Sequence, residues 1–487
     1  MNTNLSFRKA VFTIAVLLSM FQLQAKVRLP SILADNMVLQ QKTEAKLWGW
    51  ANANAKVEVK TSWNKKTYKT TADANGNWLL KINTPAAGGP FQISISDGEV
   101  LTLKNILIGE VWFCSGQSNM EMPVKGFPRQ PTKGGNSVIA KANPKVPIRM
   151  FLADSKEGKF IKQFSKKPQT DCQGQWLDNS SENVANASAT AYFFAQYVQE
   201  VLDVPVGIIV SSLGGSMVES WMSREAISAF KEVDLSVLDN DTEIKKPNST
   251  ACVNFNAKIN PFTNFTIKGF LWYQGESNKN NADLYAKLMP AFVKDLRSRW
   301  DIGEFPFYYV QIAPYNYDGA DKTSAARLRE VQTQHITDIP NSGMITTLDI
   351  GSPQFIHPVN KETVGERLAL WALGATYGKK GFGYAPPIFK SMEIKEAKIY
   401  IDFKNADQGI SPMWTPLKGF EIAGEDKIFY PANAEIETST TRLAVSSEKV
   451  AKPVAVRYAF KNYAEASIFG ITGIPVAPFR TDDWPLQ

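Results

Sequence analysis

The sequence predicts an α/β protein: a parallel sheet with flanking helices, preceded and followed by β-rich regions. Three observations along the chain predict this class. Residues 26–105 carry short strand-like runs separated by turn residues, and residues 106–384 alternate apolar runs with helical patterns. Residues 385–487 return to strand-like runs. Because strands that alternate with helices form parallel sheets wrapped by helices, we expect such a sheet in the middle region.

The first region has the spacing of a small antiparallel β-sandwich. Its apolar runs are short and are bounded by residues that favour tight turns, Asn75-Gly76 and Gly88-Gly89-Pro90. The runs fall at 46–50, 56–61, 78–82 and 91–95. Short strands punctuated in this way are typical of a sandwich, and we expect a sandwich-like domain over residues 26–105.

The middle region supplies both halves of the α/β pattern. The 191–202 segment places Phe194, Tyr197 and Val198 at the spacing of an amphipathic helix. The predicted strands are 109–114, 206–210, 269–272, 307–312 and 343–348, and the predicted helices are 191–202, 284–300 and 361–377. Beyond residue 385, strand-like runs predict a C-terminal β region that completes the α/β part or packs on it.

The composition limits the chemistry. Of the 487 residues, 44% are hydrophobic and 21% are charged, which is typical of a globular protein. Two histidines cannot build a histidine-rich metal site, and the cysteines at 114, 172 and 252 form no C-x-x-C pair and at most one disulfide. We therefore expect no metal and no cofactor, and any histidine chemistry must use His335 or His357.

The N-terminus has the features of a secretory signal. Arg8 and Lys9 supply the positive segment, and residues 10–21 form a largely apolar run. Ala25 precedes the expected cleavage before Lys26. We expect an exported protein that is periplasmic or extracellular, and the alternative is a buried core helix.

Charge and hydropathy exclude two kinds of partner. Removing residues 1–25 takes away two basic and no acidic residues, which lowers the formal charge from +7 to +5. Lysines and arginines form no block, so we expect no nucleic-acid partner. No later apolar run reaches the length of about 18 residues that a spanning helix needs, so we expect no membrane span in the mature protein. The sequence leaves the oligomeric state open.

Four polar turns follow predicted strands of the middle region. The first, residues 115–119 (Ser-Gly-Gln-Ser-Asn), lies where open α/β sheets place their sites. Gly116 allows a tight turn, and Ser118 could be a nucleophile if a base lies within hydrogen-bond reach. The alternative is a plain polar turn. The motif is not the G-x-S-x-G elbow of α/β-hydrolases.

The second and third turns could stabilise negative charge. Gly214 and Gly215 follow one strand, and paired glycines there can aim a backbone N–H at a developing oxyanion. After the next strand, Gln274 could donate a side-chain N–H to the same oxyanion, and Glu276 could orient partners or bind sugar hydroxyls. Ordinary solvated turns are the alternative for both.

The fourth turn carries a histidine. His357 stands beside Pro358 in a loop before a predicted helix, whereas His335 falls inside a helical pattern and reads more simply as structural. Because all four turns follow strands of one α/β region, we expect them to meet at one edge of the sheet. Nucleophile, oxyanion donors and base then appear in the chain order that an acyl-transfer site would need.

In these blocks the sequence resembles the SGNH hydrolase superfamily and, within it, the sialate O-acetylesterase family. The matching blocks are Gly116-Gln117-Ser118-Asn119-Met120, Gly214-Gly215-Ser216, Trp272-Tyr273-Gln274-Gly275-Glu276-Ser277 and Ile356-His357-Pro358. The likeness spans most of the mature chain, including an opening segment at 29–40 and a closing segment at 478–484. It implies an SGNH-like parallel sheet in residues 106–384.

The resemblance also implies roles for single residues. Ser118 would be the nucleophile and His357 the general base and then acid. The N–H groups of Ser118 and Gly215, with the Gln274 side chain, would form the oxyanion hole. Many relatives carry an aspartate two or three residues before the histidine, where this chain has glutamine and phenylalanine. Asp349 is our candidate for the acid that orients His357, and a backbone carbonyl in a Ser–His dyad is the alternative.

The function that the resemblance implies is a secreted carbohydrate O-acetylesterase. It would hydrolyse acetyl esters on sialic acids through a serine acyl-enzyme, with an O-acetylated sugar or glycan as substrate. Acetylxylan or another polysaccharide is the alternative substrate. Glu276 and Trp221 are the expected substrate contacts, although a tryptophan such as Trp221 can equally be a core residue.

Two other classes of function stay open from the residues alone. A glycosidase would use a carboxylate pair such as Glu219 and Glu276 and would be indifferent to Ser118. A non-catalytic glycan-binding protein would use the two β regions as binding modules and would release no acetate.

Overall fold

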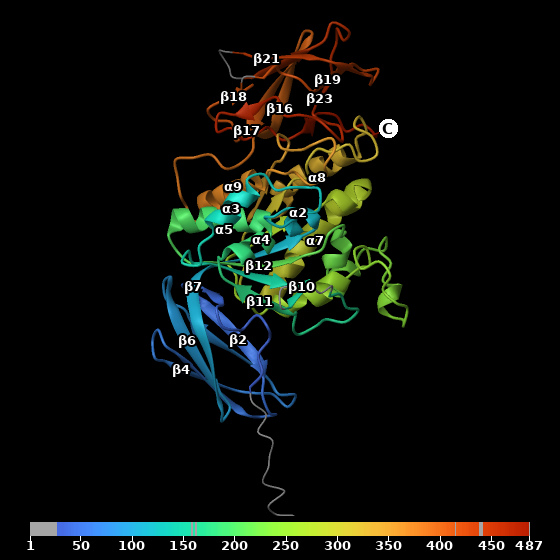
Figure 1. Ribbon diagram of the computed structural model, residues 1–487. Coiled ribbons are helices and arrows are strands. Elements are labelled where there is room, and N and C mark those ends of the chain that lie inside the picture. Colours follow the sequence, from blue (N-terminus) through green and yellow to red (C-terminus); the bar gives the residue numbers. More distant parts are fainter. Residues whose placement is uncertain (1–26, 157–158, 161–162, 414, 438–441, 487) are drawn as a thin grey trace, which may run out of the picture.

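The computed structural model describes residues 27–486 except 157–158, 161–162, 414 and 438–441, and three regions follow one another along its length (Figure 1). The β region nearest the N-terminus lies at one end, a sheet with helices fills the middle, and the C-terminal β region lies at the other end. The segment expected to be a signal, residues 1–25, lies outside the described residues.

The N-terminal region is a pair of packed β layers that continues into the middle region. One layer is the antiparallel pair of β2 and β5, and the other joins β3, β4 and β6 to β7. The strands are β1 (Val38–Gln40), β2 (Glu44–Trp50), β3 (Lys56–Thr61), β4 (Thr67–Thr71), β5 (Asn77–Asn83), β6 (Gly88–Ser96) and β7 (Val100–Gly116).

The long strand β7 belongs to two regions at once. Its first half pairs antiparallel with β6, and its second half, from Glu110, pairs parallel with β12 and then also with β13. The expected boundary between residues 105 and 106 therefore falls inside a continuous strand. No linker separates the two regions, because the same backbone serves both sheets.

The middle region holds the expected α/β sheet, in the order β11-β8-β12-β7-β13-β14-β15. Neighbouring strands are parallel except for the antiparallel pair β11–β8 at one edge, so the sheet is mixed. Its further strands are β8 (Ile148–Ala153), β11 (Gly174–Leu177), β12 (Val206–Ser212), β13 (Gly269–Tyr273), β14 (Phe307–Val310) and β15 (Ser342–Ile345). The predicted fold class is confirmed.

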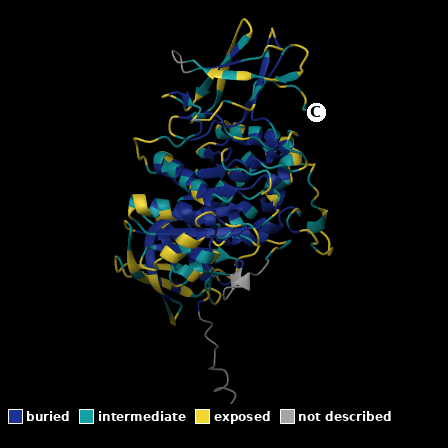
Figure 2. Ribbon diagram, turned by 45° about the horizontal axis from the view of Figure 1, so that its top comes forward, coloured by how far each residue is buried: buried dark blue, intermediate teal, exposed yellow. Residues whose placement is uncertain are grey.

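Alternation along β7 divides the core between the two faces of the sheet, since successive side chains of a strand point to opposite faces. Trp112 packs edge-on against Phe194, with ring centroids 5.0 Å apart, and Phe113 packs against Trp300 at 5.5 Å. The first face is covered by α5 (Ala189–Leu202) and α9 (Lys361–Trp371), and the second by α7 (Ala282–Trp300) and α8 (Ser324–Asp338). Figure 2 shows this buried middle layer in dark blue.

Shorter helices lie in the connections. They are α2 (Ser118–Glu121), α3 (Gly135–Lys141), α4 (Ser181–Asn186) and α6 (Arg224–Ile227). The first of them begins directly after β7 at the carboxyl edge of the sheet, and the Ser188 hydroxyl, which caps α5, donates to the Met120 carbonyl at 2.6 Å. This bond ties the turn after β7 to the helical layer.

The C-terminal region has its own small hydrophobic core and docks on the α/β part through polar contacts. Asn462 is fully buried and accepts from the Ala325 N–H at 2.8 Å, and Arg480 donates to Glu330 at 2.8 Å. Both partners belong to α8. The strands are β16 (Ile388–Lys395), β17 (Lys398–Lys404), β18 (Ile410–Ser411), β19 (Phe420–Ala423), β20 (Phe429–Pro431), β21 (Asn433–Ile436), β22 (Leu443–Ser446), β23 (Ala455–Tyr458), β24 (Phe469–Gly470) and β25 (Phe479–Arg480).

Candidate active site

The turn after β7 presents Ser118 at the carboxyl edge of the sheet. Gly116 has φ +140°, and a Cβ there would lie 2.1 Å from the Tyr273 carbonyl oxygen, so glycine alone lets β7 and β13 approach at this point. The Gln117 N–H then donates to the same carbonyl at 2.9 Å. This leaves Ser118, the first residue of α2, partly exposed.

Three side chains from distant parts of the chain meet at this turn. His357 Nε2 lies 2.8 Å from Ser118 Oγ, and His357 Nδ1 lies 2.6 Å from Gln130 Oε1. An amide oxygen can only accept, so Nδ1 carries the proton and Nε2 presents its lone pair to the serine hydroxyl. The ring of Phe127 packs edge-on against the imidazole at 5.3 Å between centroids. This is the geometry of a nucleophile, a general base and a residue that orients the base.

The surroundings keep His357 neutral. Burial lowers its pKa to about 4, and the positive charge of Lys361 acts in the same direction. A carboxylate at Nδ1 would raise that pKa, but the amide of Gln130 carries no charge. The imidazole is therefore unprotonated at neutral pH, as a general base must be.

Asp349 does not orient His357, so that expectation was wrong. Its two oxygens accept from Arg367 at 2.8 and 2.7 Å, and Arg367 also donates to the Thr346 carbonyl at 2.8 Å. A bidentate salt bridge of this kind fixes the orientation of both side chains, so Asp349 joins α9 to the loop after β15. Gln130 takes the position that we had expected an acid or a carbonyl to fill.

Two backbone N–H groups beside the serine are free to receive an oxyanion. Within the described residues, the N–H groups of Ser118 and Gly215 have no hydrogen-bond partner. Residues Gly214, Gly215 and Ser216 form a turn after β12, the glycine turn. A Cβ added at Gly214 would lie 3.5 Å from the Cβ of Ser118, so this turn approaches the nucleophile closely. Gly215 itself has φ +68°, a left-handed conformation that glycine adopts without strain.

Gln274 is not free to donate to that oxyanion, contrary to expectation. Its side chain is fully buried, and its Nε2 donates to the Ser216 carbonyl at 3.0 Å and to Asn278 Oδ1 at 2.7 Å. Both hydrogens of the amide are thereby used. Gln274 therefore stabilises the glycine turn through its hydrogen bond to Ser216 and does not face the substrate.

Glu276 lies behind the nucleophile and does not face a substrate, contrary to expectation. Its carboxylate accepts from Asn119 Nδ2 at 2.5 Å, and Asn119 Oδ1 accepts from the ammonium group of Lys361. Asn119 Nδ2 also donates to the Ile356 carbonyl at 3.2 Å, which joins the serine turn to the histidine loop. All three polar side chains are buried.

Burial shifts both charged groups of this network toward neutrality. The pKa of Glu276 is raised by desolvation, against the opposing effects of its hydrogen bonds and of Lys361. Desolvation lowers the pKa of Lys361 to about 7, against the attraction of Glu276. The buried surroundings disfavour the charged form of both groups, and the attraction between Glu276 and Lys361 partly offsets this cost.

Trp221 is a core residue, so its expected contact with sugar was also wrong. Its side chain is fully buried, its Nε1 donates to Ser216 Oγ at 2.8 Å, and its ring meets Trp272 edge-on. It supports the glycine turn. His335 is likewise buried, with Nε2 3.3 Å from the Ala286 carbonyl and a pKa lowered to about 4 by burial.

A cavity of about 290 Å³ adjoins the site at the ends of β8 and β12. Phe127, which contacts His357, lines it together with Glu121, and Lys125 supplies a positive charge. The Lys125 ammonium donates to Asn186 Oδ1 at 2.7 Å and is exposed.

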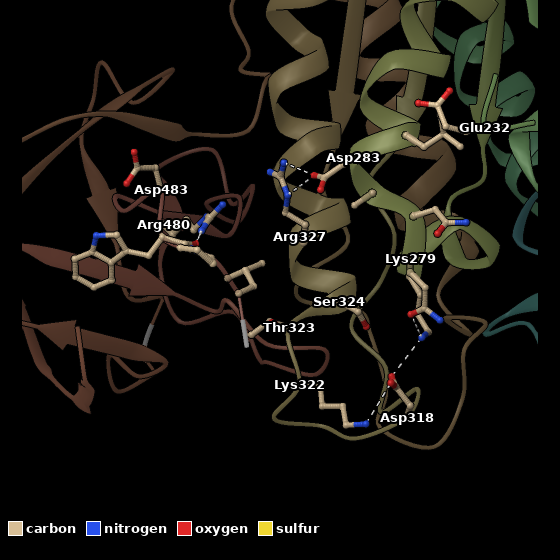
Figure 3. A pocket seen from close by; sticks show the side chains of 17 residues that line it. Glu232, Lys279, Asp283, Asp318, Lys322, Thr323, Ser324, Arg327, Arg480 and Asp483 are labelled. Atoms are coloured by element: carbon tan, nitrogen blue, oxygen red, sulfur yellow. Dashed lines mark hydrogen bonds and ion pairs between the residues drawn. The ribbon is translucent and has the colours of Figure 1, made fainter. Parts of the chain in front are cut away.

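A second cleft, of about 1100 Å³, lies between α7, α8 and the C-terminal tail (Figure 3). Neither Ser118 nor His357 lines it. Its charged side chains largely pair with one another, as Arg327 does with Asp283 at 2.7 Å. Asp318 is also shared by two lysines in Figure 3. We therefore interpret this cleft as part of the interface between the α/β region and the C-terminal region.

Three further findings concern the described part of the chain. It contains no helix with the length and apolar character needed to cross a membrane. No cluster of three or more His, Cys, Asp or Glu side chains is arranged to bind a metal ion in those residues. The three cysteines are free and buried.

Comparison with known proteins gives a consistent result. A family model described as carbohydrate esterase, sialic acid-specific acetylesterase matches residues 108–373, more than half of the chain. The sialate O-acetylesterases of Rattus norvegicus and Homo sapiens are 27% and 28% identical to it, over 93% and 94% of this chain and 94% of each relative.

A solved structure agrees with these relatives. The crystal structure of a carbohydrate acetylesterase from Xanthomonas citri superposes with a TM-score of 0.84 at 32% identity, covering 94% of this chain and 100% of that one. The segment that the family model matches, residues 108–373, contains every strand from the second half of β7 to β15. It also contains both Ser118 and His357. The chain thus belongs to the sialic acid-specific acetylesterase family of carbohydrate esterases and is a carboxylic ester hydrolase.

Proposed function

We propose that the protein removes acetyl groups from O-acetylated sugars, with O-acetylated sialic acids as its preferred substrates. The contact of Ser118 Oγ with His357 Nε2, whose Nδ1 is held by Gln130, carries this proposal. The family model and the mammalian relatives support the sugar class. The exposed cation of Lys125 at the adjoining cavity offers a partner for the carboxylate that sialic acids carry.

The reaction would proceed through an acyl-enzyme. Ser118 Oγ attacks the acetyl carbonyl carbon while its proton passes to His357 Nε2. The carbonyl oxygen becomes an oxyanion that accepts from the N–H groups of Ser118 and Gly215. The bond to the sugar oxygen then breaks, and that oxygen takes the proton from His357. Water then attacks the acetyl carbon while its proton passes to His357, the bond from that carbon to Ser118 Oγ breaks, Oγ takes the proton back from His357, and acetate leaves.

The alternative substrate class is an acetylated polysaccharide such as acetylxylan. The structural similarity to a carbohydrate acetylesterase supports it, because that name specifies no sialic acid. A glycosidase acting through Glu219 and Glu276 is disfavoured, since both carboxylates are buried and hydrogen-bonded, to Asn278 at 2.9 Å and to Asn119 at 2.5 Å.

The test compares acetate release from 9-O-acetylated sialic acid and from acetylated xylan, by the wild type and by Ser118→Ala. We expect faster release from the sialic acid and a loss of at least about 10⁴-fold in kcat for the variant. An unchanged rate in Ser118→Ala would refute the serine mechanism. A preference for xylan would assign the protein to the alternative substrate class.

We also propose that the protein is exported to the periplasm or the extracellular space, supported by the charged and apolar pattern of residues 1–25. Fractionation of the producing cells, followed by N-terminal sequencing, tests this. We expect a mature chain beginning at or near Lys26 outside the cytoplasm. A cytoplasmic protein that retains residues 1–25 would contradict the proposal.

A further inference from the structure

Several hydrogen bonds hold the glycine turn opposite Ser118, and one of them determines where the Gly215 N–H points. The Gly214 N–H donates to a carboxylate oxygen of Glu121, on the same short helix as Ser118. The Gly214 carbonyl accepts from the side-chain amide of Asn248. Both polar groups of Gly214 are thus fixed, one by the nucleophile helix and one by a loop between β12 and β13.

The bond from Asn248 sets the direction of the Gly215 N–H. The peptide between Gly214 and Gly215 is trans, since the one cis bond in the described chain is at Pro90. In a trans peptide the C=O and the following N–H lie in one plane and point in opposite directions. Because Asn248 holds the oxygen on one side, the Gly215 N–H must point to the other side, where no described residue accepts it.

The loop that carries Asn248 is itself anchored, so it can serve as a fixed point. The Asn248 carbonyl accepts from the Met217 N–H at 2.9 Å. The neighbouring Pro247 carbonyl accepts at 3.1 Å from Asn254, which is fully buried and also donates to Ser220 at 2.8 Å. The turn and its support are therefore joined through both backbone and side chains.

We propose that Asn248 is a positioning residue that aims the Gly215 N–H at the oxyanion. This inference rests on the proposed function, because it assumes that an oxyanion forms beside Ser118. Asn248 need not touch the substrate. Its bond maintains a peptide plane that two glycines, with no side chains to restrict them, would otherwise hold weakly. The oxyanion exists only in the transition state, so the contribution should appear in kcat and not in KM.

The sharpest variant is Asn248→Asp, which keeps the shape of the side chain but replaces the donor with an oxygen that repels the Gly214 carbonyl. Losing an oxyanion donor outright costs roughly 10²- to 10³-fold in kcat. A misdirected donor should cost less, and we expect a fall of roughly 10- to 100-fold with KM within about twofold. Asn248→Ala should fall between this variant and the wild type, because water can replace the lost bond.

Asn240→Asp is the matched control. Asn240 lies in the same connection, is exposed, and donates its side-chain amide to a backbone carbonyl, that of Ser236, at 2.8 Å. The same chemical change there should leave kcat and KM within twofold of the wild type. Rates are expressed per active site, counted by titration with a serine-reactive phosphonate, so that a misfolded fraction does not count as a slow enzyme.

Methylboronic acid provides a readout that general destabilisation would not change. Its tetrahedral adduct with Ser118 matches the acetyl group in size and places an oxygen where the oxyanion forms. We expect its Kd to rise in Asn248→Asp by the same factor by which kcat falls, and to stay unchanged in Asn240→Asp. Unchanged kcat per active site and unchanged boronate affinity in Asn248→Asp and Asn248→Ala would overturn the inference. A wild type that releases no acetate from O-acetylated sugars would instead refute the proposed function.

Discussion

The two sides of Ser118 differ in the kind of groups that surround them: neutral groups on the accessible side and charged groups on the buried side. On the accessible side, the serine meets an imidazole that is held by a neutral amide, Gln130. On the buried side, Asn119 links a carboxylate to an ammonium group, and this network joins the serine turn to the histidine loop. The comparison indicates that charge is used to fix the backbone of the site, whereas the reacting groups are kept uncharged until the reaction begins.

The buried side should show its role in stability. Lys361→Met leaves an acceptor of Asn119 unpaired and removes the charge that faces Glu276. Breaking a buried charge pair in this way costs roughly 3–5 kcal/mol, which urea unfolding at pH 6, below the pKa of about 7 of Lys361, would measure. The double variant with Glu276→Gln should recover part of the loss, because it leaves no uncompensated charge. A double variant that is less stable than Lys361→Met would contradict the paired role.

The accessible side should show its role in rate. Gln130→Ala removes the acceptor that fixes the proton on Nδ1 and the orientation of the ring, but it does not impose the wrong tautomer. We expect kcat to fall by roughly 10- to 100-fold, within the contribution of a general base, with little change in melting temperature. Gln354→Ala is the control, because Gln354 is an exposed glutamine in the histidine loop. Equal activity of the two variants would exclude Gln130 from the site.

The smallest effect on activity is expected at Asp349. Asp349→Asn keeps one acceptor for Arg367 and loses the other, so it should lower the free energy of unfolding by about 1 kcal/mol. Since Asp349 belongs to neither side of Ser118, kcat/KM should stay within about twofold of the wild type from pH 5 to 8. A shift in the pH profile of the esterase activity would restore Asp349 to the role that the sequence suggested.

Strand-end turns were predictable because the fold gathers them by a simple rule. Parallel strands bring their carboxyl ends to one edge, so Ser118, Gly215 and His357 could be placed together from their order alone. Gln130 carried no such signal. It lies 227 residues from its partner, in a loop with no predicted strand before it, and glutamine is too common to mark a site.

Burial was the second property that sequence could not provide. Glu276 and Trp221 follow strands, as site residues do, but their side chains turn inward, and only the packing of neighbouring turns decides that direction. Asp349 was misassigned for a related reason, since Arg367 on α9 is a better-placed partner for it than the imidazole. The boundary expected between residues 105 and 106 lies inside β7, because this strand pairs with strands of both regions.

The pH dependence of kcat/KM for the wild type and for Gln130→Glu shows whether a neutral amide holds the general base. Burial and Lys361 lower the pKa of His357 to about 4, and the base acts only when unprotonated. The wild type should therefore stay active as the pH falls and lose activity only near pH 4. A carboxylate at Nδ1 stabilises the imidazolium, so the acid limb of Gln130→Glu should move to higher pH. Coincident limbs, or a wild-type limb at pH 6.5, would contradict a histidine held by a neutral amide.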